Sequence, residues 1–199
     1  MAKLLFRYGA MNSGKTTILI QTAHNYEERD QRVIVIKPSE DTKGASKIVS
    51  RLGVDREVDY LVNKDTNIID LLENEFDNLD CILVDEAQFI TKEQAFQLMI
   101  IAKVYDVHVI AYGLRTDFKT NGFEGATRLL ELADELQEMP TICRCGKKAR
   151  FNGRKVNGEF VIEGESVAID NSPDYQYESL CGKCYLEKVL NVKKRKLSN

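Results

Sequence analysis

The chain has 199 residues, of which 43% are hydrophobic and five are cysteines. This length suits one moderate domain, or one domain with a small appendage, and the apolar content is enough for a real core. A formal net charge of −3 argues against a surface built mainly to hold nucleic-acid backbone. There is no long apolar run and no signal-peptide pattern, so we expect no membrane partner and a cytoplasmic protein with reduced thiols.

The first predicted elements are a strand, a glycine-rich loop and a helix. The apolar residues 4–6 predict the strand, and residues 15–29 predict the helix. The loop between them fits the phosphate-binding pattern G-x-x-x-x-G-K-[ST], with a glycine-rich turn before an ordinary helix as the alternative. Backbone N–H groups and the helix dipole favour phosphate oxygens in such a loop. The motif predicts nucleoside triphosphate binding by Gly9, Ala10, Met11, Asn12, Ser13, Gly14, Lys15 and Thr16.

Further along the chain, short apolar runs alternate with helical patterns. Strands are predicted at 33–36, 58–62, 81–84, 107–111 and 137–142, and helices at 68–76, 92–105 and 126–133. Thr91 is a plausible N-cap, and residues 39–53 predict a loop or a short hairpin. Continuous apolar strands alternating with helices indicate a parallel sheet with right-handed crossovers. The sequence therefore predicts an α/β fold.

Two acidic residues follow the predicted strand 81–84. Asp85 is expected to position Mg²⁺ together with the Thr16 hydroxyl, while Lys15 reaches the outer phosphates. A helix cap or solvated turn is the alternative reading of Asp85. Glu86 faces another direction, where a carboxylate can accept a proton from an attacking hydroxyl or water. The dipeptide alone leaves open whether the nucleophile is water, as in an ATPase, or an alcohol, as in a kinase.

The character of the chain changes near residue 143, so we predict domains at 1–141 and 142–199. The second segment has short alternating pieces at 149–156, 159–162 and 166–169 and a helical pattern at 185–190. Two close cysteine pairs suit tetrahedral Zn²⁺, although the first pair is one residue shorter than usual. Free thiols or disulfides are the alternatives, and Cys81 is expected to be a buried small hydrophobe. The predicted zinc ligands are Cys143, Cys145, Cys181 and Cys184.

In this order and spacing the motifs resemble those of the type II thymidine kinases over nearly the whole chain. The resemblance rests on the P-loop with Met11 and Ser13, on residues 84–89 and 112–118, and on the cysteine pairs with residues 177–180 before Cys181. It implies a RecA-like P-loop parallel sheet with a small C-terminal zinc-binding lasso domain. It also implies ATP and thymidine as substrates, a homotetramer, and feedback inhibition by thymidine triphosphate.

The resemblance also implies residue roles. Glu86 would deprotonate the sugar 5′-hydroxyl, and Asp85, Glu86, Ala87 and Gln88 would lie at the ATP phosphates. Thymine would be held by the lasso, largely through main-chain groups, and the implied nucleoside-binding residues are Phe118, Asn152, Ala168, Ile169, Asp170, Asn171, Ser172 and Tyr177. Two departures are a lasso one residue longer than in relatives and Lys43 in place of the family's usual arginine.

Two other classes of protein share parts of this pattern. A RecA-like or helicase-like ATPase acting on DNA would also carry a P-loop and an Asp-Glu-Ala-Gln run. It would need a second motor domain or an arginine finger, and neither is identifiable. A zinc-bearing nucleic-acid module would need a basic stripe with aromatics, for which the evidence is thin. We therefore expect a kinase without a stable nucleic-acid partner.

Overall fold

The structure is a computed structural model that describes residues 1–40, 46–164 and 175–192. Contacts divide the chain into two compact units. The first unit comprises Met1–Gly9, Gly14–Arg115 and Gly122–Met139, and the second comprises Ala10–Ser13, Thr116–Asn121 and Pro140–Asn199. Among the described residues, none of the helices combines the length and hydrophobicity needed to cross a bilayer.

A six-stranded sheet forms the centre of the first unit. All of its neighbouring strands pair in parallel, in the order β5-β2-β6-β7-β1-β8. The strands are β1 (Leu4–Tyr8), β2 (Val33–Pro38), β5 (Tyr60–Val62), β6 (Cys81–Val84), β7 (His108–Gly113) and β8 (Glu135–Glu138). Every residue of β2 and β6 is buried, as expected for apolar strands covered on both faces. The prediction of a parallel α/β sheet is confirmed.

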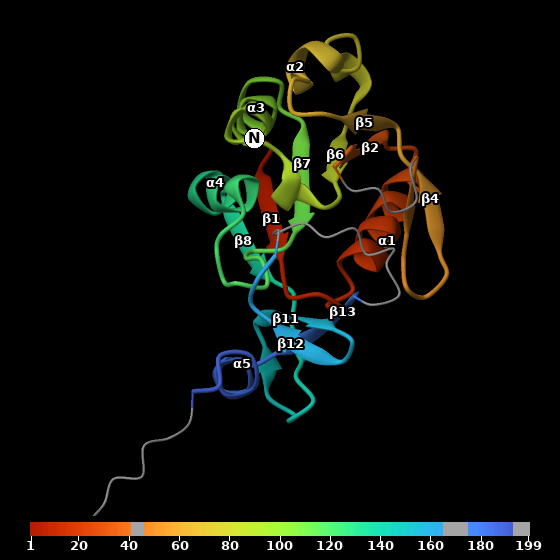
Figure 1. The fold of residues 1–199 in the computed structure, drawn as a ribbon. Coiled ribbons are helices and arrows are strands. Elements are labelled where there is room, and N and C mark those ends of the chain that lie inside the picture. The colour runs from red at the N-terminus through yellow and green to blue at the C-terminus, as the bar shows by residue number, and fades with distance from the viewer. Residues whose placement is uncertain (41–45, 165–174, 193–199) are drawn as a thin grey trace, which may run out of the picture. The chain divides into compact units, whose positions relative to one another are not determined.

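Helices cover both faces of this sheet (Figure 1). They are α1 (Lys15–Glu27), α2 (Ile68–Leu71), α3 (Lys92–Val104) and α4 (Glu124–Leu132). Leu19 and Ala23 of α1 belong to one apolar cluster, whereas α3 and α4 contribute Leu98, Ile101 and Leu129 to another. The sheet therefore lies between two cores. Thr91 caps α3 in a reciprocal capping box with Gln94, as the sequence predicted.

Several predicted boundaries differ from the structure. The helix expected at 68–76 is one turn long, because Phe76 leaves its pattern and stacks on Tyr105 from a separate 3-10 turn, Phe76–Asn78. The strand expected at 137–142 is divided into β8 and β9 (Thr141–Ile142) by Pro140, which has no N–H for a ladder. An antiparallel hairpin, β3 (Lys47–Val49) with β4 (Asp55–Glu57), begins within the predicted loop or hairpin and extends beyond it.

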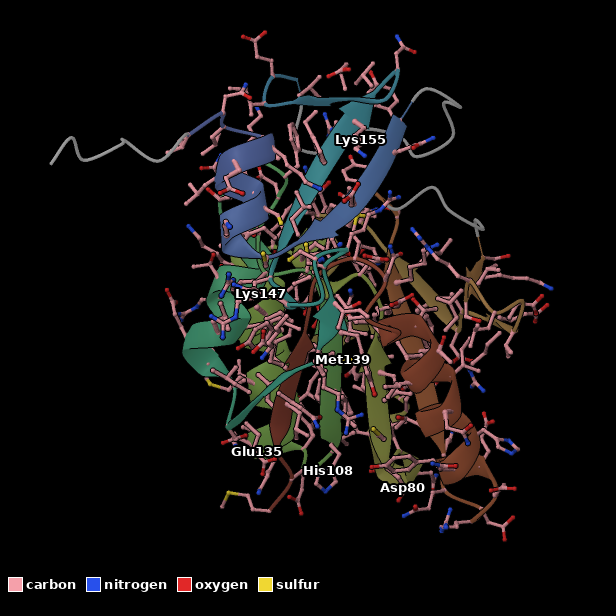
Figure 2. All side chains as sticks on the ribbon, turned by 90° about the horizontal axis from the view of Figure 1, so that it is seen from below. Asp80, His108, Glu135, Met139, Lys147 and Lys155 are labelled. Carbon is pink, nitrogen blue, oxygen red and sulfur yellow. The ribbon has the colours of Figure 1, made fainter. Side chains whose placement is uncertain are left out.

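The parallel arrangement gathers all strand starts at one edge of the sheet. Asp80, His108 and Glu135, at the starts of β6, β7 and β8, lie along that edge, and Met139 lies toward the other (Figure 2). The chain leaves β1, β6 and β7 at the opposite, carboxyl edge. Ligands of open α/β sheets bind outside this carboxyl edge.

The second unit is built from short antiparallel strands and one helix. A two-stranded ladder joins β9 to β10 (Lys148–Ala149), and a three-stranded sheet has the order β12-β11-β13. The remaining elements are β11 (Phe151–Val156), β12 (Glu159–Val161), β13 (Tyr175–Leu180) and α5 (Gly182–Lys188). The strand expected at 166–169 lies outside the described residues. The domain boundary at residue 141 stays a prediction.

Candidate active site and cysteine cluster

The P-loop lysine of the first unit lies buried at the carboxyl edge of the sheet. Gly14 precedes α1 with a left-handed φ of 78°, which favours glycine. Lys15 is only 9% exposed, and its Nζ donates to the Gly9 carbonyl oxygen at 3.3 Å. Burial lowers the pKa of Lys15, while the negative charges of Glu86 and Asp85 act to raise it. The arrangement sets a cation near two carboxylates, where phosphate and Mg²⁺ charges could be balanced.

Asp85 and Glu86 turn the chain out of β6. Asp85 is 4% exposed, and its backbone N–H donates to the Ile36 carbonyl at 2.9 Å, which continues the ladder with β2. Glu86 has φ 46° and ψ 39°, a left-handed conformation that is uncommon for a residue with a side chain. Such outliers cluster at functional sites because the surrounding structure must hold them in place.

Gln88 ties the Glu86 side chain to the end of β7. Its Nε2 donates to Glu86 Oε2 at 2.6 Å, and its Oε1 accepts from the Leu114 backbone N–H at 2.9 Å. A Cβ on Gly113 would lie 2.9 Å from Gln88 Oε1, so glycine leaves room for this bridge. Sequence reasoning assigned Gln88 to the phosphates only and missed its contact with Leu114, which lies 26 residues away. Ala87 is fully buried in the core.

In the second unit, Met11 of the P-loop is bonded to two strands. The Met11 N–H donates to Asn152 Oδ1 at 2.8 Å, and its carbonyl accepts from the Ser179 hydroxyl at 2.5 Å. Asn152 in β11 and Ser179 in β13 are cross-strand partners. Asn152 was predicted near the base, so its bond to the P-loop and the role of Ser179 are additions from the structure.

Two other predicted nucleoside-binding residues lie together in the second unit. Phe118 and Tyr177 both contact Arg154, whose Cζ is 3.7 Å from the Phe118 ring centroid and whose Nε donates to the Tyr177 hydroxyl at 3.0 Å. The Tyr185 hydroxyl donates to the Phe118 carbonyl at 2.7 Å. The other predicted members of this set, Ala168, Ile169, Asp170, Asn171 and Ser172, lie outside the described residues, as does Lys43.

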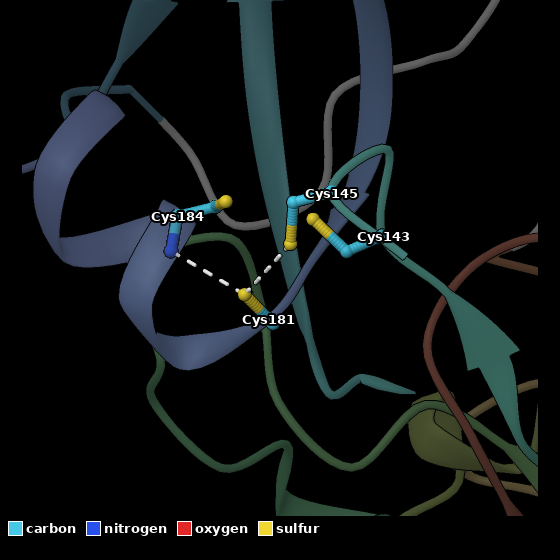
Figure 3. A group of neighbouring side chains, drawn as sticks. All are labelled: Cys143, Cys145, Cys181 and Cys184. Atoms are coloured by element: carbon cyan, nitrogen blue, oxygen red, sulfur yellow. Dashed lines mark hydrogen bonds between the residues drawn. The ribbon is translucent and has the colours of Figure 1, made fainter. Parts of the chain in front are cut away.

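The four cysteines predicted as metal ligands gather in the second unit (Figure 3). Their sulfur atoms all lie within 4.8 Å of one another, and Cys145 Sγ is 3.6 Å from Cys181 Sγ. A tetrahedron with Zn–S bonds of ~2.3 Å has sulfur–sulfur edges of about 3.8 Å. The Gly146 N–H donates to the Cys143 carbonyl at 2.8 Å in a turn where Gly146 has φ 82°. This tight turn brings Cys143 and Cys145 together despite their short spacing.

The four thiols of the cluster differ in acidity, and a hydrogen bond with Cys145, together with burial, raises the pKa of Cys184 to about 12. Burial acts to raise the pKa of Cys143, but hydrogen bonds with the backbone at Cys145 and Cys181 lower it to about 7. The Cys184 N–H also donates to Cys181 Sγ at 3.5 Å, which favours the thiolate and lowers its pKa. Thiolates are the metal-binding form. Burial raises the pKa of Cys81 to about 12, so that thiol behaves as a small core hydrophobe. The donor set and its spacing fit a four-thiolate metal site.

The amino-acid sequence of the chain is similar to a known protein family and to individual relatives. The family model described as "Thymidine kinase" matches residues 2–185. A thymidine kinase of Francisella tularensis subsp. holarctica is 41% identical over 95% of this chain and 99% of its own length. One from Rhodopirellula baltica is 44% identical over 88% and 85%, and one from Legionella pneumophila strain Paris is 45% identical over 88% and 86%.

A likeness among solved structures is weaker. A DNA replication initiation factor aligns with a TM-score of 0.42 and 19% identity, over 70% of this chain and 40% of the other. The family model covers nearly all of this chain, and the relatives align over most of their own length. The chain therefore belongs to the thymidine kinase family.

Proposed function

We propose that this chain transfers the γ-phosphate of ATP to the 5′-hydroxyl of thymidine, and of deoxyuridine, to supply monophosphates for deoxynucleotide salvage. The observation that carries this proposal is the 41–45% identity to proteins named thymidine kinase over most of their length. The buried Lys15 near Asp85 and Glu86 supports it, because phosphoryl transfer depends on positioning and charge stabilisation. The helicase-like alternative is not favoured, since the chain belongs to the kinase family.

On the donor side, residues 9–16 would hold the ATP phosphates through backbone N–H groups and the Lys15 ammonium. Thr16 and Asp85 would hold Mg²⁺, which when bound neutralises phosphate charge. Asp85, Glu86, Ala87 and Gln88 would lie along the phosphates at the same strand edge. Glu86 lies in a left-handed turn directly after Asp85, and we assign the two neighbouring carboxylates separate roles.

On the acceptor side, Glu86 would accept the proton of the 5′-hydroxyl as that oxygen attacks the γ-phosphate. The Gln88 amide, bonded to Glu86 Oε2, would hold the carboxylate in one orientation. Phe118, Asn152 and Tyr177 would hold the thymine together with main-chain groups of residues 168–172. Bond formation at phosphorus and proton transfer to Glu86 then leave ADP and the nucleoside monophosphate as products.

The four-cysteine cluster would hold one structural Zn²⁺, because four thiolates leave no open coordination position for catalysis. We assign residues 1–141 to an ATP-binding domain and residues 142–199 to a zinc-binding lasso domain. From the family resemblance we further propose a cytoplasmic homotetramer inhibited by thymidine triphosphate, without a stable nucleic-acid partner.

The test is to incubate the protein with ATP, Mg²⁺ and each deoxynucleoside and to separate the phosphorylated products by chromatography. Thymidine and deoxyuridine should give monophosphates with one ADP formed per product molecule. Deoxyadenosine, deoxyguanosine and deoxycytidine serve as controls and should give little product. ATP hydrolysis that requires DNA, with no nucleoside phosphorylated, would instead support the motor alternative.

A further inference from the structure

Among the residues that the structure describes, Arg154 is the largest fully buried side chain, with 2% of its surface exposed. It lies in the middle of β11, between Gly153 and Lys155. Arginine is almost never fully buried unless its charge is compensated, because removing a cation from water is costly. A guanidinium in this position therefore requires specific contacts that stabilise it.

Aromatic side chains surround the Arg154 guanidinium. Its guanidinium carbon lies 3.7 Å from the centroid of the Phe118 ring, close enough for the planar group to stack on the ring. Its Nε donates to the Tyr177 hydroxyl at 3.0 Å, and the Tyr175 ring centroid is 5.8 Å away. One guanidinium thus connects residues 116–121, β11 and β13 within the second unit.

The position of Phe118 is fixed at both its ring and its backbone. The Tyr185 hydroxyl of α5 donates to the Phe118 carbonyl at 2.7 Å. Two cations lie over the ring, since Lys119 Nζ is 5.5 Å from the centroid against which Arg154 packs, and Phe118 is only 2% exposed. The Tyr177 hydroxyl oxygen likewise accepts a hydrogen bond from Arg154 Nε. The hydroxyl hydrogen therefore points away from Arg154, toward another acceptor.

We propose that Arg154 is a positioning residue that fixes the Phe118 ring and the Tyr177 hydroxyl for the thymine base. The inference rests on the proposed function, in which both aromatic residues contact the base. A preformed aromatic wall lowers the entropy lost on binding, so its loss should weaken nucleoside binding more than phosphoryl transfer. Lysine cannot replace arginine here, since an ammonium group lacks both the flat face and the directional Nε–H.

The test compares Arg154→Lys and Arg154→Ala with the wild-type protein in steady-state assays of both substrates. We expect the KM for thymidine to rise about tenfold or more, while the KM for ATP and kcat stay within about twofold. Lys155→Met is the matched control. Lys155 is the next residue after Arg154 in β11, and its Nζ donates to Glu178 Oε2 at 2.7 Å. The KM for thymidine should therefore not change in this variant.

Two further measurements separate positioning from a general loss of structure. Tyr177→Phe removes only the hydroxyl that accepts from Nε, so combined with Arg154→Lys it should add less than its separate effect. Methylguanidine added to Arg154→Ala should lower the KM for thymidine toward the wild-type value. If Arg154→Ala does not fold, Arg154→Lys and Tyr177→Phe still provide the test.

The outcomes distinguish this inference from the function on which it rests. A wild-type protein that makes no thymidine monophosphate would overturn the proposed function. An active wild type with an Arg154→Lys variant of unchanged kinetics would overturn only the positioning role. Equal rises of both KM values, without rescue by methylguanidine, would also overturn it, because that pattern indicates a general structural effect.

Discussion

Glu86 combines an unusual backbone conformation with a tightly held side chain. Its left-handed φ and ψ cost on the order of 1–3 kcal/mol in a residue with a Cβ. Hydrogen bonds around the residue offset this cost. Gln88 Nε2 donates to Glu86 Oε2, and the Asp85 N–H donates to the Ile36 carbonyl. A carboxylate held in one position is what a proton acceptor requires.

Glu86→Gln is the sharpest test of that role. The amide has nearly the same shape, and its oxygen can still accept from Gln88 Nε2, so the local fold should persist. Since the amide cannot accept the proton, kcat should fall about a hundredfold or more. ATP affinity, measured by isothermal titration calorimetry with Mg²⁺ present, should stay nearly unchanged. Unchanged turnover would refute the assignment, and Glu73→Gln, an exposed carboxylate on the surface, is the control.

Site residues could be predicted from the sequence where the residues that act together are close neighbours in the chain. The P-loop, Asp85–Glu86 and the cysteine pairs carry their signal in adjacent positions, so no tertiary information was needed to select them. Gln88 with Leu114, Asn152 with Met11, and Arg154 with Phe118 are separated by many residues. Their contacts depend on which strands become neighbours, and no local pattern records that choice.

At the scale of elements, the predictions that agree best with the structure are those for strands buried on both faces. The strands β2, β6 and β7 were predictable because parallel strands covered on both faces are continuous apolar runs. The one-turn helix α2 and the short strands of the second unit were less predictable. Their boundaries are set by single contacts, such as Phe76 on Tyr105, and by the missing N–H of Pro140. Short elements carry too few residues for periodicity to locate their ends.

The strand β13 holds part of the P-loop, which gives an element-scale prediction. Ser179→Ala removes the hydroxyl that donates to the Met11 carbonyl, an interaction worth roughly 1 kcal/mol. The loop should become less ordered, and the KM for ATP should rise by about fivefold in steady-state assays. Gln176→Ala, an exposed position three residues earlier on the same strand, should leave the KM for ATP unchanged. Equal KM values for the two variants would contradict the role of β13.

At the scale of the whole molecule, the two units are stabilised in different ways. The first unit has two apolar cores on a six-stranded sheet, whereas the described part of the second buries a single small cluster that includes Cys143, Cys181 and Cys184. Small domains with little apolar core usually need a metal or a crosslink. The cysteines of the described residues form no disulfide, and four of them form a group that could hold a metal ion.

Zinc removal should therefore affect the second unit first. The wild-type protein should contain about one zinc per chain by inductively coupled plasma mass spectrometry, and Cys181→Ser should lose most of it. Because folding and structural zinc binding are linked, the variant should also melt at a lower temperature and lose thymidine phosphorylation. Cys81→Ala is the matched control, since Cys81 lies in the first unit's core and should keep the zinc. Stoichiometric zinc retained in Cys181→Ser would exclude the four-cysteine site, because three thiolates and a serine hydroxyl bind the ion much less tightly.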